Sequence, residues 1–246
     1  ENTRVLNTHV EIDIPKTLNE PTTYVLTHFM EGQSLFDVAG GGYSGDVGYW
    51  ATADGTPVYE LASHTPYDYD HYVGGDCNID IKGYTFTRKV IGGGFYGSCN
   101  NTHTNVICGS LRQVYGGSLL GYVHGRALTN IGTQVEDWIP DFHTTYHSNL
   151  DEVPADILAA AEAEAYENNR HTIIAENIYG GNDVKGIIGT EKFQPRYGTP
   201  EFANDGSRLY AEYTDEGPLF YCDVTKTEEK GVVMNLYGGT YMGDVY

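Results

Sequence analysis

Three aspartates in the first third of the chain have a spacing that suits a bound cation. Asp68, Asp70 and Asp76 lie in or beside a stretch, residues 65–72, that also carries three tyrosines. Carboxylate oxygens are ligands that Ca²⁺ prefers, although the glycine and the distal glutamate of an EF-hand loop are missing here. The segment is therefore a calcium site, a set of tyrosines that stack on sugar rings, or an exposed loop before a strand. Ca²⁺ is the one cofactor that the sequence suggests.

A second candidate metal pair is His143 and His147, which are four residues apart. That spacing places both rings on one face only if the segment is helical. Thr144 and Thr145 disfavour a helix, and no glutamate lies between the histidines as in a zinc-protease motif. A polar loop is the preferred interpretation of this segment.

No set of residues identifies a reaction. A nucleophile motif of the G-x-S-x-G type is absent, and the glycine runs lack the Gly-Lys-Ser/Thr ending of a phosphate loop. The 34 acidic residues leave open a pair of carboxylates facing one groove, as in a glycosidase. The interpretation therefore favours a role without catalysis.

The four cysteines are Cys77, Cys99, Cys108 and Cys222, and none forms a C-x-x-C pair. This spacing disfavours a zinc knuckle. Two disulfides in an oxidising compartment and buried free thiols remain as alternatives.

The net charge of −20 disfavours nucleic acid and anionic membranes as partners, because like charges repel. No apolar run approaches the roughly 18 residues of a membrane helix, so we expect no membrane insertion. The sequence begins at Glu1 without a signal peptide, which is typical of a processed chain or of a segment of a longer one.

A glycine motif recurs along the chain and is the strongest structural signal. Each copy has a branched aliphatic residue, any residue, Gly-Gly, a few variable residues and a further Gly, followed in most copies by another apolar residue. The five copies start at Val38, Val90, Val114, Ile178 and Leu236. Such recurrence predicts stacked turns, with these five side chains forming an aliphatic ladder and the glycines at corners.

A fainter signal recurs at intervals of about 25 residues. It is seen at Asn78-Ile79, Asn105-Val106 and Asn130-Ile131. With the alternation of period two, it predicts two or three short strands in each turn. The expected fold class is all-β, a parallel β-helix or solenoid; a sandwich of short antiparallel strands is the alternative.

The domain organisation follows from where the motif is interrupted. Residues 1–36 are expected to form N-terminal strands or a cap, and residues 37–246 to form the turns. One helical insertion is expected at about 134–172, with a helix starting near Pro154 and an apolar stripe that includes Ile157 and Ala161. An irregular, tyrosine-bearing insertion is expected at about 190–230.

The phrases Gln113–Gly117, Asn177–Gly181 and Leu128–Ile131 resemble the glycine-rich repeats of large surface proteins of gut-dwelling Gram-negative bacteria. The resemblance covers about residues 37–50, 77–133, 173–189 and 232–246. It implies an adhesin-like protein with a right-handed parallel β-helix, exported to the cell surface.

The function expected from the sequence is a secreted or cell-surface structural or adhesive module, as a segment or subunit of a larger extracellular assembly. The alternatives are a carbohydrate-active β-helix enzyme, that is, a polysaccharide lyase or hydrolase, and a carbohydrate-binding module. Because the chain stops at Tyr246 within a motif and shows no polar cap, the expected partners are other subunits or further chain, with polysaccharide as a ligand.

Overall fold

The chain alternates between two parallel sheets that face each other across an apolar core. The computed structural model describes residues 5–14, 36–51, 71–182, 188, 196–197, 210–214, 217–221 and 231–246. Asp68, Asp70, Cys222 and the strand expected at residues 24–29 lie outside these ranges.

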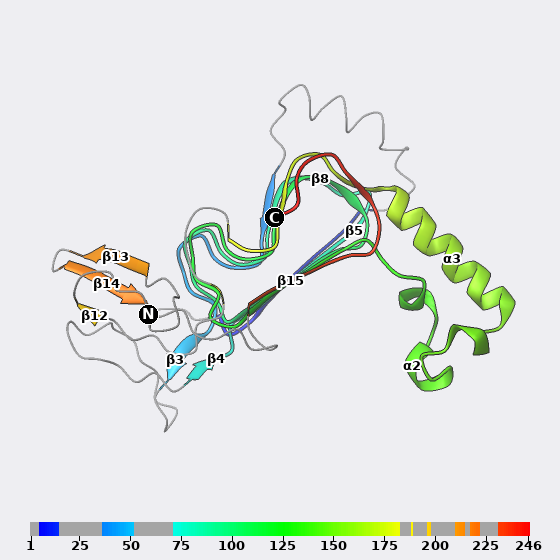
Figure 1. The fold of residues 1–246 in the computed structure, drawn as a ribbon, viewed down its shortest axis with the longest axis horizontal. Helices are drawn as coiled ribbons and strands as arrows, with labels where there is room; N and C mark the ends of the chain where they lie inside the picture. Colours follow the sequence, from blue (N-terminus) through cyan, green and yellow to red (C-terminus); the bar gives the residue numbers. More distant parts are fainter. Residues whose placement is uncertain are drawn as a thin grey trace.

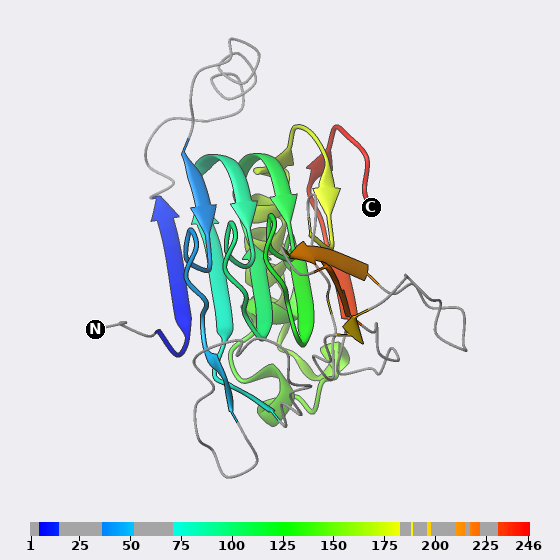
Figure 2. The ribbon, with the colours of Figure 1, turned by 90° about the vertical axis from the view of Figure 1, so that its left-hand side faces the viewer.

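The first sheet contains five strands that are all parallel and lie in the order in which they occur in the chain. Figure 2 shows them side by side, so that each turn of the chain adds one strand to the sheet. They are β1 (Thr8–Ile14), β5 (Asp76–Gly83), β7 (Asn101–Val106), β9 (Arg126–Ile131) and β15 (Gly231–Leu236).

The second sheet is built from the alternate strands and is also parallel. Figure 1 views the turns end on, with the two sheets as the sides of one coil. Its strands are β2 (Asp37–Ala39), β6 (Phe86–Ile91), β8 (Gly109–Tyr115), β10 (Thr172–Ile174) and β16 (Thr240–Tyr241), and β11 (Ile178–Tyr179) also pairs with β8.

Strand β7 shows why this sequence forms half-buried strands. Its residues alternate strictly between buried and partly exposed positions, so threonines and Val106 point inward while Asn105 points outward. Burying a hydroxyl requires a hydrogen bond, and Thr102 Oγ1 donates to the carbonyl oxygen of Gly116 on the opposite side at 2.6 Å. The interior is therefore apolar and contains threonines: Thr102 bonds to a corner, whereas the buried hydroxyls of Thr104 and Thr129 have no hydrogen-bond partner among the described residues.

The expected aliphatic ladder is present for four of its five members. These four side chains stack in register across neighbouring strands and are all at most 4 % exposed: Val38, Val90, Val114 and Ile178.

The fifth member was assigned wrongly. Leu236 lies opposite Ile131 in the first sheet and is 41 % exposed, whereas Val245 forms the bridge to Ile178. The reason is local: Asn235 pairs with Asn130, so the segment repeats the Asn-Ile signal and only looks like the Gly-Gly motif. The Asn-Ile signal is also offset between β5 and β7. In the register of these two strands, Asn105 lies opposite Asp80, whereas the recurrence of the signal predicts Asn78, two residues away.

Gly92 shows what the corner glycines do. A Cβ atom on Gly92 would lie 2.0 Å from the carbonyl oxygen of Gly116 in the next turn. Real Cβ contacts are never that short, so the turns stack closely only because the side chain is missing.

The expected all-β class is wrong, because helices accompany the two parallel sheets and the arrangement is α/β. The segment after Pro154 forms a helix because its Ala-rich sequence has high helix propensity and Asp156 complements the helix dipole. This segment is also too long to form one turn of the coil. The helix expected after Pro154 is 16 residues long. The helical elements are η1 (Glu136–Trp138), α2 (Phe142–Thr145), η2 (Leu150–Glu152) and α3 (Ala155–Arg170).

These helices form an arm that projects from one corner of the coil (Figure 1). The arm has its own small core, in which Ile139, Phe142, Val153 and Ala161 are buried. None of the described helices is long and apolar enough to cross a membrane.

Two small antiparallel sheets complete the described structure. One pairs β3 (Tyr49–Ala51) with β4 (His71–Val73). The other lies within the tyrosine-bearing segment and consists of β12 (Arg196–Tyr197), β14 (Gly217–Tyr221) and β13 (Tyr210–Thr214).

Candidate functional site

A groove of about 630 Å³ lies where the helical arm meets the outward face of the first sheet. Its floor comes from the ends of the sheet strands, and its walls come from the η1 segment and α3. The lining residues are Asp13, Lys82, Gly83, Asn105, Ile107, Asn130, Gly132, Thr133, Gln134, Asp137, Trp138, Glu164, Asn168 and Tyr237.

The two ends of the arm are held together at the groove. Thr133 opens the arm directly after β9, and Asn169 closes it at the end of α3. The backbone N–H of Thr133 donates to Asn169 Oδ1 at 2.9 Å, and Asn169 Nδ2 donates back to the Thr133 carbonyl oxygen at 2.9 Å. This reciprocal amide pairing fixes how the arm leaves the sheet, and so it fixes the width of the groove at its base.

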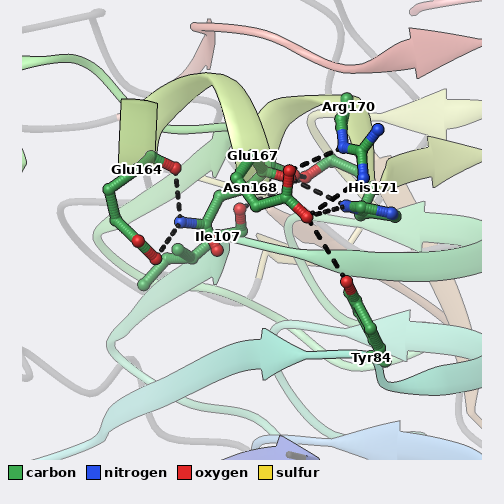
Figure 3. A network of polar contacts seen from close by, with 8 residues as sticks. Tyr84, Ile107, Glu164, Glu167, Asn168, Arg170 and His171 are labelled. Atoms are coloured by element: carbon green, nitrogen blue, oxygen red, sulfur yellow. Dashed lines mark hydrogen bonds and ion pairs between the residues drawn. The ribbon is translucent and has the colours of Figure 1, made fainter. Parts of the chain in front are cut away.

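A second network joins the last turn of α3 to the sheet corners (Figure 3). Glu167 is at its centre: its carboxylate pairs with Arg170 at 2.7 Å and accepts from the Tyr84 hydroxyl at 3.4 Å. His171 Nδ1 lies 2.9 Å from the Glu167 carbonyl oxygen. Asn168 Nδ2 donates to Glu164 Oε1 at 3.1 Å, which holds the carboxylate of this groove-lining residue in place.

The opposite wall is ordered by a compact set of side-chain bonds. Asp137 Oδ2 accepts from the Gln134 backbone N–H at 2.8 Å and from Thr133 Oγ1 at 2.9 Å. Trp138 Nε1 donates to the same Thr133 hydroxyl at 2.9 Å. The carboxylate and the indole are therefore held in fixed positions before any ligand arrives, which lowers the entropic cost of binding.

The groove floor contains part of a continuous amide ladder on the outward face of the sheet. Asn105 Nδ2 donates to Asp80 Oδ1 at 2.8 Å, Asn130 Nδ2 to Asn105 Oδ1 at 2.8 Å, and Asn235 Nδ2 to Asn130 Oδ1 at 2.9 Å. Each amide is thus oriented by its neighbours, and the ladder presents polar groups at the regular strand spacing of about 4.8 Å.

The lining suits a hydroxyl-rich ligand. Amides and carboxylates offer donors and acceptors, and Trp138 and Tyr237 offer aromatic faces, with Tyr237 40 % exposed. Three carboxylates against one lysine make the groove acidic, so it disfavours anionic ligands.

Of the three aspartates expected from the sequence to bind a metal, only Asp76 lies within the described residues, so that expectation stays a prediction. Asp68 and Asp70 lie outside the described residues. Asp76 is in β5, where its Oδ1 accepts from Asn101 Nδ2 at 2.8 Å. His143 and His147 have separate partners, Ser148 at 2.7 Å and Glu152 at 3.4 Å.

The thiols are described for three of the four cysteines. Cys77 and Cys99 are free and buried, Cys108 is buried, and Cys222 lies outside the described residues. Of the two alternatives left by the sequence, buried thiols hold for Cys77 and Cys99.

Sequence reasoning missed the groove altogether, because its lining comes from β1, β5, β7, β9, the η1 segment, α3 and the residue after β15. The recurrence of Asn105 and Asn130 was visible, and it could have located the floor. Nothing in the spacing of Asp137, Glu164 and Tyr237 indicates that they meet.

In comparisons with family models, with curated proteins and with solved structures, nothing matched this chain.

Proposed function

We propose that the protein is an extracellular adhesive module that binds an uncharged polysaccharide in the groove between the arm and the first sheet. The observation that carries the proposal is the lining, in which aromatic faces lie among pre-oriented amides and carboxylates. Ligand sites combine an apolar surface with a few fixed polar groups in this way. The resemblance to glycine-rich bacterial surface proteins supports the cell-surface location.

The charge of the protein selects the class of polysaccharide. The chain carries a net charge of −20, and the groove itself holds Asp13, Asp137 and Glu164 with Lys82 as the one cation of its lining. A uronic-acid or sulfated polymer is repelled both by the net charge of the protein and by the carboxylates of the groove. A neutral polymer does not, and its hydroxyls match the amide ladder.

The test is a titration of the protein with a panel of neutral and anionic polysaccharides, followed by calorimetry. Saturable binding of a neutral polymer is expected. Tyr237→Ala should weaken it about tenfold, equivalent to about 1.4 kcal/mol. Tyr166→Ala is the matched control, because Tyr166 is 69 % exposed on α3 and does not line the groove. Equal loss in both variants, or binding only of anionic polymers, contradicts the proposal.

A carbohydrate-active enzyme is the second candidate, since Asp137 and Glu164 both face the groove. Glycoside hydrolysis requires two carboxylates on either side of the scissile bond. Shortening of the bound polymer over time, abolished by Glu164→Gln, favours this candidate over a binding module. Intact polymer after prolonged incubation favours binding alone.

The exposed last turn supports the structural part of the proposal, which is membership of a larger assembly. Val232, Met242 and Tyr246 are 48 %, 57 % and 65 % exposed, and they lie on or beside the outermost strands β15 and β16. Exposed apolar residues on an edge strand favour pairing with another strand. Light scattering should show mass rising with concentration, and Met242→Glu should reduce the association; Tyr96→Glu, at a 52 % exposed site elsewhere, should not.

A further inference from the structure

Strands β1 and β5 bring an imidazole and two carboxylates together on the outward face of the first sheet. His9 and Glu11 are two residues apart in β1 and therefore point to the same side. Glu11 lies directly opposite Asp80 of β5 in the parallel register. The nearest ligand atoms of the three side chains all lie within 4.8 Å of one another, and His9 Nε2 is 2.9 Å from Asp80 Oδ2.

We propose that His9, Glu11 and Asp80 bind one Zn²⁺ ion, with a fourth coordination position open to water. Zinc is bound by imidazole nitrogen and carboxylate oxygen at about 2.0–2.2 Å, which separates neighbouring ligand atoms by about 3.0–3.5 Å. The side chains of His9, Glu11 and Asp80 are 57 %, 51 % and 21 % exposed, so solvent reaches the open position.

The Asp80 carboxylate is already oriented for this role. Its Oδ1 accepts from Asn105 Nδ2 at 2.8 Å, which directs Oδ2 toward His9. Hydrogen bonds to the ligands of a metal fix their orientation and raise affinity. Because Asn105 is itself held by Asn130 through the amide ladder, the turns behind β5 support the site.

Lys82 provides the sharpest test of the proposed zinc site, because its ammonium group already pairs with the Glu11 carboxylate. Its Nζ lies 2.8 Å from Glu11 Oε2, on the same face of the sheet. A zinc ion must displace this ammonium group before Glu11 can coordinate. Removal of the lysine charge should therefore strengthen zinc binding, whereas a role for Lys82 in merely holding the strands together predicts no gain.

Zinc at this position would join the edge strand to its neighbour. Among the described residues, β1 pairs with β5 alone. A ligand that binds only the folded state raises its stability in proportion to the logarithm of its concentration. The amides of β1 should thus exchange more slowly when zinc is bound, and this effect is independent of the polysaccharide proposal.

The experiment is a calorimetric titration of chelator-treated full chain with zinc chloride, repeated with Co²⁺ to record the absorption spectrum. One site per chain with nitrogen and oxygen ligation is expected. His9→Ala and Glu11→Gln should each weaken it at least tenfold, and Lys82→Met should tighten it. His103→Ala is the matched control, because His103 is in the same row of the sheet with Asn78 and Leu128 as its neighbours in the register.

Four results would overturn the proposal. They are the absence of zinc binding, binding that survives His9→Ala, an equal loss in His103→Ala, and a thiolate band in the Co²⁺ spectrum. Since His9 and Glu11 are exposed, their variants are expected to fold, and their circular dichroism checks this.

Discussion

Replacing Asn105 by alanine tests the amide ladder, which supports both the groove floor and the proposed zinc site. The substitution removes a hydrogen bond to the Asp80 carboxylate and another from Asn130, both at 2.8 Å. A neutral bond contributes about 1 kcal/mol and one to a charged group about 1.5–3 kcal/mol. Because Asn105 is half-buried, we take the lower values and expect a loss of about 2–3 kcal/mol.

The assay is urea denaturation at pH 7, with calorimetry for the midpoint temperature. A loss of this size lowers Tm by roughly 4–12 °C for a domain of this length. Asn78→Ala is the control: Asn78 lies on the same face, and its one side-chain hydrogen bond among the described residues, to the Thr8 carbonyl oxygen, is long at 3.3 Å. If Asn105→Ala costs less than about 0.5 kcal/mol, or if Asn78→Ala costs as much, the ladder does not stabilise the sheet.

The pH dependence gives a second check on the same variant. Burial raises the pKa of Asp80, but the hydrogen bonds from Asn105 and His9 outweigh it and leave this pKa below its ordinary value. A carboxyl whose pKa is lowered on folding adds stability above its unfolded value of about 3.9, and this stability is lost as the pH falls through the folded value. The difference between Asn105→Ala and the parent should therefore be full at pH 7 and shrink below about pH 4. A difference that is unchanged at pH 3 would show that the bond to Asp80 is not its source.

Gly92→Ala should cost about 3 kcal/mol or more in urea denaturation, because its Cβ would lie 2.0 Å from a backbone oxygen of the next turn. Gly45→Ala, which meets nothing within 4 Å, should be close to neutral, and equal losses would contradict the close stacking of the turns. His124 is buried, which lowers its pKa to about 3, so its ring signals in NMR should not shift between pH 5 and 8; stability should fall as the pH drops from about 6.5 toward 3, since only the unfolded chain takes up the proton. Cys77 and Cys99 are fully buried and should react with an aromatic disulfide reagent only after denaturation; rapid reaction of either in the folded Cys222→Ser chain would contradict their burial.

The stacking of turns could be predicted from the sequence because it depends on local patterns. Val38, Val90 and Val114 occupy equivalent places before a Gly corner, and the structure places them in one row. The prediction for Leu236 was wrong because two different signals, an Asn-Ile type of pair and a Gly-Gly pair, share the same short run of residues. Only the pairing of Asn235 with Asn130 separates them, and strand register is a long-range property.

The fold class was mispredicted because the glycine corners dominate the pattern, so that the expected helix counted only as an insertion into an all-β fold. The helix itself was visible, from Pro154 to Arg170, as a strong local propensity. The way in which the helix docks on the sheets could not be predicted, because docking depends on the bond between Glu167 and Tyr84 and on the pairing of Asn169 with Thr133. These contacts span more than 30 residues, so no periodicity encodes them.

The candidate sites show the same limit. His9 and Glu11 alternate along one strand, which sequence can show, but Asp80 joins them across 69 residues through the parallel register. The groove likewise needs Tyr237 and Asp13, from opposite ends of the chain, to line one space.

The most direct test of the polysaccharide proposal uses the indole of Trp138, which lines the groove. In a ¹H–¹⁵N NMR titration with a neutral oligosaccharide, the indole N–H signal of Trp138 should shift and saturate, with Trp138→Phe giving the assignment. The ring signals of Tyr166, which is 69 % exposed on α3 and does not line the groove, should stay in place. No shift of Trp138 when calorimetry shows binding, or a shift of Tyr166 alone, would contradict the groove as the binding site.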